Sequence, residues 1–247
     1  GRQLARRFDD HGFAYTTGEM FDGFFPGYGS TWPTLQGGLG ILWEQAGVRG
    51  LVIDRDDERQ LRFHDAVRHH YVSALATLEF AASHARRLVE EFYESRRRSI
   101  QLGREGPVRH YFLPAGKAPQ RAAGLAELLR GNGIEVQRLT KTVKANCTDI
   151  RTAEKGPREI PAGSFHIAVA QPAGRLARAL LDRQVEMDRE FVERQLQRNA
   201  DRLPDEIYDV TTWSLPLAWG VDCLSTEASV EVVGEPWDGT PRAGEVV

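Results

Sequence analysis

The sequence predicts an α/β protein, in which part of a mixed sheet with helices is followed by a smaller α/β domain. Three observations predict this. Apolar residues recur at helical spacing over residues 61–98, and strand and helix patterns alternate after residue 107. Between these two regions the residue pattern changes at the glycine- and proline-containing stretch Gly103-Arg104-Glu105-Gly106-Pro107. We therefore expect one domain over residues 1–102 and another over residues 107–247.

Composition excludes several classes of protein. The chain has 247 residues, 41% of them hydrophobic and 27% charged, which is typical of a globular chain and not of a disordered or membrane chain. Its net charge of -3 predicts no nucleic-acid partner. No apolar run reaches the roughly 18 residues of a membrane segment. Cys147 and Cys223 are too far apart for a zinc knuckle and allow at most one disulfide bridge.

The first elements are a helix and a long loop. Residues 1–9 have the apolar positions of a helix at Leu4, Ala5 and Phe8. Because the chain starts at Gly1 inside this pattern, we expect the natural N-terminus, with any localisation signal, to precede it. Residues 18–40 are rich in glycine, proline and aromatic residues, and a loop of this length is more often functional than idle.

A short strand pattern that ends in a carboxylate follows this loop. Leu39, Ile41, Leu42 and Trp43 predict a buried strand, and Glu44 comes directly after them. Glu44 has two interpretations: a strand-end carboxylate paired with a nearby arginine such as Arg49, or a general base where a sheet strand ends. Burial beside Trp43 and Trp32 would raise the pKa of Glu44 towards neutrality, as a general base requires.

Residues 61–98 predict one long helix that packs on a sheet, after a short extended piece at Leu51–Ile53. The charges flanking the helix suit its dipole, with aspartates before it and Arg96, Arg97 and Arg98 at its end. Its apolar residues recur every three or four positions: Val67, Tyr71, Leu75, Leu78, Ala82, Ala85, Val89 and Phe92.

The second domain begins with a β-α-β pattern. "VRHYFLP" and "IEVQRL" predict strands on either side of the helix "APQRAAGLAELLRGNG", which a glycine closes. Residues 141–163 form a polar segment without a clear element. Beyond it, "SFHIAVAQ" predicts a strand, and "AGRLARALL" and "EMDREFVERQLQRN" predict helices. "YDVTTWSLPLAWGV" is apolar enough to pack on the core, whereas "GEPWDGTPRAGEVV" is rich in turns.

Common catalytic motifs are absent from the sequence. Ala118 follows Gly116-Lys117 where a phosphate loop needs serine or threonine, Trp32 stands where a dinucleotide fingerprint needs glycine, and no serine lies in G-x-S-x-G. No histidine begins H-x-x-E. His64 and His69 lie about 140° apart around a helix and favour a solvated face over a zinc site. His11, His84, His110 and His166 are isolated and are interpreted as structural.

One segment carries a family resemblance. Residues 13–47, with "GEMFDGFFPGYGSTWPTLQGGLGILWEQAG", resemble the last catalytic segment of zinc carboxypeptidases, the carboxypeptidase A-like metallopeptidases. In that family a loop with a tyrosine leads to a Gly-Ser element, a tryptophan and, about a dozen residues later, a strand carrying the catalytic glutamate. The resemblance implies that Glu44 is the general base and acid. It places Phe25 at the mobile tyrosine, which Tyr28 could replace, and Gly29 and Ser30 at the specificity pocket.

The resemblance also implies zinc as cofactor and a peptide or protein C-terminus as substrate. The zinc ligands of the family, an H-x-x-E pair and a later histidine, are absent from this sequence, so we expect this chain alone neither to hold catalytic zinc nor to hydrolyse peptides. Residues from about 107 resemble the accessory extension of some large bacterial members. The family further suggests a secreted or periplasmic location.

We therefore interpret this chain as a portion of a zinc-dependent metallocarboxypeptidase-like hydrolase. The alternative is a non-catalytic peptide- or protein-binding module derived from a peptidase. An upstream reading frame that encodes the ligand motif would favour the first, and a start codon near Gly1 the second.

Overall fold

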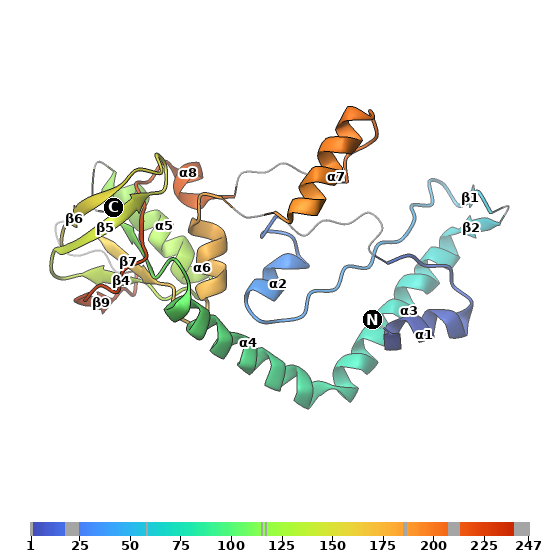
Figure 1. The fold of residues 1–247 in the computed structure, drawn as a ribbon. Coiled ribbons are helices and arrows are strands. Elements are labelled where there is room, and N and C mark those ends of the chain that lie inside the picture. The colour runs from blue at the N-terminus through green and yellow to red at the C-terminus, as the bar shows by residue number, and fades with distance from the viewer. Residues whose placement is uncertain are drawn as a thin grey trace. The chain divides into compact units, whose positions relative to one another are not determined.

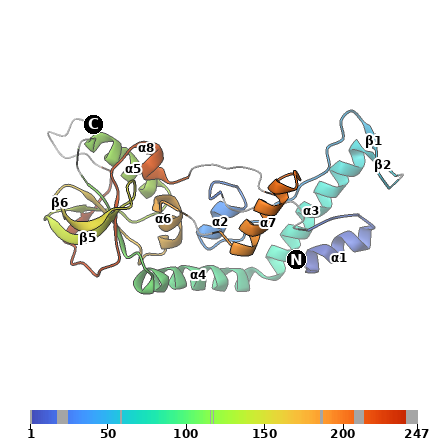
Figure 2. The ribbon, with the colours of Figure 1, turned by 45° about the horizontal axis from the view of Figure 1, so that its top comes forward.

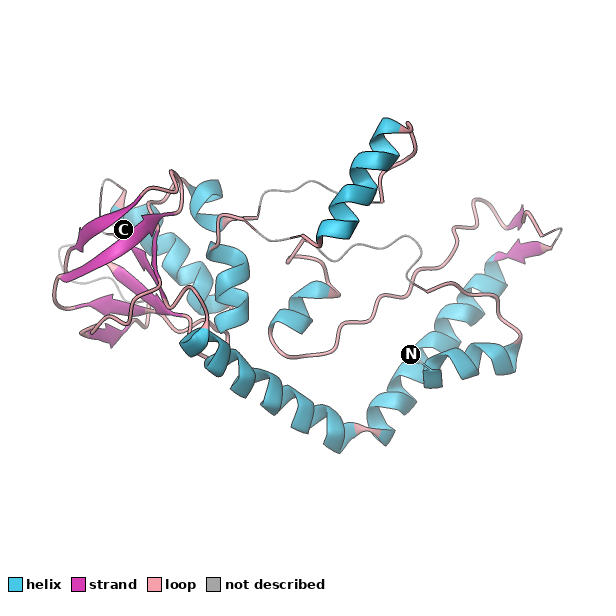
Figure 3. Cartoon of the chain, in the orientation of Figure 1, coloured by secondary structure: helices cyan, strands magenta, loops and turns pink. Residues whose placement is uncertain are grey.

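The computed structural model describes residues 2–17, 25–57, 59–114, 116, 118–184, 187–206 and 213–239 (Figure 1). The chain forms two compact units. The first unit comprises residues 1–21 and 40–92, and the second comprises residues 22–39 and 93–247. Helices and strands mix in the chain, as predicted, but the large sheet lies wholly in the second unit (Figure 3).

The first unit is built around the pairing of two helices. Helix α1 (Arg2–His11) packs on α3 (Phe63–Ser83) through Leu4 and Phe8, which are buried. Strands β1 (Val52–Asp54) and β2 (Gln60–Arg62) form an antiparallel pair just before α3. The predicted N-terminal helix and the extended piece at residues 51–53 are both confirmed.

The predicted long helix is two helices. Helix α3 ends at Ser83 and α4 (Ala85–Glu105) begins after His84, whose φ of -120° leaves the helical region. Helix α3 packs on α1 and contacts β2 of the small two-stranded sheet, whereas the large sheet belongs to the other unit. A row of large apolar side chains on α3, which we call the apolar stripe, is exposed instead: Phe63, Val67, Tyr71, Leu75 and Leu78.

The strand predicted over residues 39–43 does not form. These residues have no regular secondary structure, and Leu39, Ile41 and Leu42 are exposed. Within the described part of the chain, residues 39–50 make no backbone–backbone hydrogen bond. The prediction fails because strand propensity reflects packing and pairing with a neighbour, and the described residues place no neighbouring strand here.

The second unit contains a seven-stranded sheet in the order β6-β5-β8-β3-β7-β4-β9, with every pair antiparallel. The strands are β3 (His110–Leu113), β4 (Gln137–Leu139), β5 (Val143–Asp149), β6 (Lys155–Ile160), β7 (Phe165–Ala168), β8 (Leu224–Thr226) and β9 (Gly234–Pro236). The helices that lie wholly in this unit are α2 (Thr31–Leu35), α5 (Pro119–Gly131), α6 (Gly174–Leu181), α7 (Arg189–Ala200) and α8 (Leu215–Trp219), and the C-terminal part of α4 also belongs to it.

The predicted β-α-β unit is confirmed as β3-α5-β4. Both strands pair with β7 and so run parallel to each other on either side of it. The main core joins Tyr111 and Leu113 of β3 to Leu125 and Leu129 of α5 and to apolar residues of α6. Figure 2 shows these helices beside the sheet. A smaller cluster of buried residues includes Phe112, Leu139, Val143, Cys147, Ile160 and Leu224.

Four strands of the large sheet lie where the sequence predicted none. Strands β5 and β6 form a hairpin within the polar segment 141–163. Strand β8 follows the apolar stretch that ends at Val221, and β9 lies in the turn-rich C-terminal stretch. Trp237, next to β9, packs its ring 4.8 Å from that of Phe165 on β7. The helices predicted from "AGRLARALL" and "EMDREFVERQLQRN" are α6 and α7, and "SFHIAVAQ" contains β7. Residues 208–212 and 240–247 of the last two predicted stretches lie outside the described residues.

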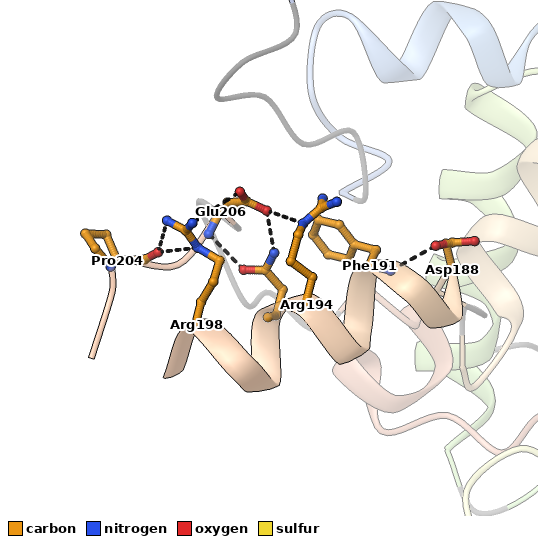
Figure 4. A network of polar contacts seen from close by, with 7 residues as sticks. Asp188, Phe191, Arg194, Arg198, Pro204 and Glu206 are labelled. Carbon is orange, nitrogen blue, oxygen red and sulfur yellow. Dashed lines mark hydrogen bonds and ion pairs between the residues drawn. The ribbon is translucent and has the colours of Figure 1, made fainter. Parts of the chain in front are cut away.

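Helix α7 is stabilised by polar contacts with the chain that follows it (Figure 4). The Asp188 carboxylate accepts a hydrogen bond from the Phe191 backbone N–H at 2.9 Å and so caps the helix. Glu206 accepts hydrogen bonds from Arg194 at 2.9 Å and from Gln195 at 2.7 Å. These contacts lower the pKa of Glu206, with the Gln195 bond the largest cause.

Candidate functional site

Glu44, the predicted catalytic residue, is exposed in coil in the first unit. Its expected burial is wrong, since Glu44 is exposed. The alternative ion pair with Arg49 does not form among the described residues either. Glu44 is therefore a solvated carboxylate in this structure.

The residues on either side of Glu44 fix the chain at this point. Trp43 donates its indole N–H to Thr77 Oγ1 of α3 at 3.1 Å and packs edge-on against Phe8 at 5.2 Å. Gln45 Oε1 lies 2.9 Å from His69 Nδ1, also on α3. Trp43 and Gln45 are thus anchored on α3, whereas Glu44 between them is exposed.

His69 shows how this anchoring affects a titratable group. Its ring lies 4.2 Å from that of Phe13, and partial burial lowers the pKa of His69. A histidine that is neutral at this position can share one nitrogen with Gln45 without the cost of a buried charge. His69 therefore serves the local packing and, among the described residues, belongs to no metal site.

The other predicted site residues lie in one turn of the second unit. Phe25 and Tyr28 pack edge-to-face at 5.3 Å, and the Tyr28 carbonyl accepts hydrogen bonds from the N–H groups of Thr31 and Trp32. Gly29 and Ser30 follow directly and lead into α2, whose residues Trp32 and Leu35 pack against the main core. Residues 18–24 of the predicted loop lie outside the described residues.

The structure thus brings Phe25, Tyr28, Gly29 and Ser30 together but assigns Glu44 to a different unit. Trp32, which the resemblance uses as a landmark, contributes to the core of the second unit. The described residues therefore define the part of the predicted site in each unit by itself.

The sequence did not predict a hydrogen-bonded network of three polar side chains in the second unit, His110, His166 and Gln137. His166 on β7 accepts or donates at both ring nitrogens: Nε2 lies 2.9 Å from His110 Nδ1 on β3, and Nδ1 lies 3.0 Å from Gln137 Oε1 on β4. Burial, reinforced by the neighbouring His110, lowers the pKa of His166 to about 3. Burial also lowers the pKa of His110, together with the charge of Arg109. Their separation of 56 residues gave no local signal.

A second, partly buried polar group surrounds Asp182. Tyr111 donates its hydroxyl to this carboxylate, and Arg178 donates to the same carboxylate at 3.2 Å. Burial, followed by the charge of Asp182, raises the pKa of Tyr111. Burial likewise raises the pKa of Cys223, so its thiol is protonated and unreactive. This cluster is a partly buried structural network and not a nucleophile with its base.

The part of the chain that the structure describes offers no metal centre, because no group of three His, Cys, Asp or Glu side chains there could hold a metal ion. The zinc that the family resemblance implies therefore has no fitting set of ligands among these residues. The helices of the described part include none long and apolar enough to cross a membrane.

Comparison with known proteins adds no relative. No protein-family model, no curated protein and no solved structure matches this chain.

Proposed function

We propose that this chain is a portion of a zinc-dependent metallocarboxypeptidase-like hydrolase in which Glu44 is the general base and acid. The observation that carries the proposal is the state of residues 39–44. They have the sequence of a buried strand ending in a carboxylate, yet they form no strand, are mostly exposed and have no backbone hydrogen-bond partners among the described residues. Such a segment is suited to join a sheet that a longer polypeptide supplies.

The apolar stripe of α3 supports the same proposal. Phe63 and Tyr71, with exposed fractions of 56% and 63%, are large side chains that normally lie in a core or an interface. They belong to the same unit as residues 40–44. A unit with both an unpaired strand segment and an uncovered helix face is suited to be one part of a larger domain.

The role proposed for Glu44 is proton transfer. Its carboxylate would accept a proton from the attacking water and return it to the leaving amine of a C-terminal peptide bond. Anchoring of Trp43 and Gln45 on α3 would hold the carboxylate in a fixed direction, which general acid–base catalysis requires. The zinc ligands of the proposed enzyme lie outside the described residues, so the contribution proposed for these residues is proton transfer alone.

The test uses the longer polypeptide, provided that its upstream region encodes an H-x-x-E pair and a later histidine. In that protein, Glu44→Gln should lower kcat on peptides with a free C-terminus by about 10²-fold or more, with zinc content unchanged. Glu190→Gln, an exposed carboxylate in the first turn of α7, is the matched control and should leave kcat unchanged. Unaltered turnover in Glu44→Gln would remove Glu44 from the mechanism.

Hydrogen exchange tests the structural basis separately. The amides of residues 39–43 should exchange fast in the 247-residue chain, where they have no backbone partner among the described residues, and slowly in the longer protein, where they would join a sheet. Equal, fast exchange in both proteins would contradict the proposed completion of the sheet.

A peptide- or protein-binding module is the second candidate. The same unpaired segment favours it, because an extended peptide can add to an exposed strand and gain main-chain hydrogen bonds. In this case peptide should protect residues 39–43 from exchange in the 247-residue chain without being cleaved. Glu44→Gln would then leave peptide affinity nearly unchanged.

A further inference from the structure

A cavity in the second unit lies at the ends of three interior strands of its sheet and is lined by none of the residues proposed for peptide hydrolysis. Its volume is about 150 Å³, at least about ten times the roughly 10–15 Å³ that admits one water molecule. Strand β8 lies between β3 and β5 and runs antiparallel to both. Strands β3 and β5 therefore run in the same direction, and their carboxyl ends lie at the same end of the sheet. The lining residues Pro114 and Arg151 follow these strands, and Asp222 precedes β8.

Two guanidinium groups line this cavity, and each has an anchor. Arg151 donates to Asp222 Oδ1 at 3.0 Å, and its backbone carbonyl accepts from Arg183. Arg121 donates to the Trp219 carbonyl at 3.4 Å and lies against Gly220, where a Cβ would come within 2.9 Å of its Nη1. Gly220 has a φ of 59°, which favours glycine, so the turn leaves room for this guanidinium.

The charge of the cavity favours an anion. Arg121 and Arg151 contribute two positive charges and Asp222 one negative charge, which leaves one net positive charge among these three side chains. Each guanidinium carries five N–H donors, of which the anchoring bonds use few. Planar donor pairs of this kind suit the oxygen pairs of phosphoryl and carboxylate groups. The first turn of α5, which contains Arg121, has no acidic residue to compete.

We propose that this cavity binds a small oxyanion, a phosphoryl or carboxylate group, through Arg121 and Arg151. The site would give the second unit a ligand-binding role of its own, independent of Glu44 and of peptide hydrolysis. The bound group would take the remaining N–H donors of both arginines, with Asp222 holding Arg151 in place.

The test measures binding of inorganic phosphate and of acetate to the 247-residue chain by calorimetry at low ionic strength. Saturable one-to-one binding is expected for at least one of the two anions. Arg121→Gln and Arg151→Gln should each weaken it by about tenfold or more. Tighter binding of phosphate than of acetate would identify a phosphoryl ligand, and the reverse order would identify a carboxylate ligand. Arg121→Lys, which keeps the charge but loses the planar donor pair, should bind with intermediate affinity.

Arg189→Gln is the matched control, because Arg189 is exposed on α7, pairs with Glu193 and does not line the cavity. It removes the same charge and should leave binding unchanged. Far-UV circular dichroism establishes that each variant is folded. The proposal is overturned if neither anion binds saturably, or if Arg189→Gln weakens binding as much as Arg121→Gln does.

Discussion

Acidification from pH 7 to pH 5 should destabilise the sheet of the second unit through His166. This side chain is 3% exposed, and burial lowers its pKa to about 3. In the unfolded chain the same ring has a pKa near 6.5. Below pH 6.5 the unfolded state therefore binds a proton that the folded state does not, so stability falls as the pH decreases towards 3.

The magnitude follows from the width of this window. For one histidine that stays neutral in the folded state, each pH unit below 6.5 lowers the free energy of unfolding by about 1.4 kcal/mol. The free energy of unfolding at pH 5 should therefore be about 2 kcal/mol lower than at pH 7. His110, whose pKa is also lowered, adds to the loss with the same sign. Carboxylates with a lowered pKa, such as Glu127, begin to contribute only near and below their unfolded pKa of 4.5. The range between pH 7 and pH 5 thus isolates the histidines.

The assay is urea unfolding at pH 7, 6 and 5, with amide exchange in β3 and β7 as the probe of this sheet. His166→Gln keeps a donor and an acceptor beside Gln137 and His110 but cannot titrate, so it should reduce the loss at pH 5 by about 2 kcal/mol. His70→Gln, an exposed residue of the first unit, is the control and should follow the wild type. An identical pH dependence in His166→Gln and the wild type would refute the reasoning.

Other predictions concern single contacts. Gly103→Ala should lower the free energy of unfolding by about 2 kcal/mol, because the added Cβ would lie 2.4 Å from the Val169 carbonyl carbon. At Gly131 an added Cβ would meet nothing within 4 Å, so Gly131→Ala should lower the free energy of unfolding by less than about 1 kcal/mol in the same urea assay. Asp188→Ala removes the cap of α7 and should cost that helix about 1 kcal/mol. Because α7 has no buried residue, this loss should appear as faster exchange of its amides and not as a shift in global unfolding. Equal effects of the two glycine substitutions, or unchanged α7 exchange, would contradict these expectations.

The sequence predicts elements whose stability is local and misses those that depend on distant partners. The helices α1, α5, α6 and α7 have apolar periodicity or clear terminal residues within their own span, and all were predicted. Strand β5 has Val143, Ala145 and Cys147 alternating with polar residues, but small side chains make this alternation weak. Strand β6 contains Pro157, which is tolerated because β6 is the edge of the sheet, a fact that only the strand order reveals.

Prediction of the candidate site from the sequence is limited in the same way, because its residues also depend on distant partners. The pattern at residues 39–43 correctly describes side chains that suit a buried strand, but a strand exists only when a neighbour accepts its hydrogen bonds. His110 and His166 meet because β3 and β7 pair in one register, in which Phe112 lies opposite His166. Shifting that register by one residue would turn His166 to the other face of the sheet and break its hydrogen bond to Gln137. The buried histidine pair therefore reports on pairing register, and its pH dependence measures whether that register forms in solution.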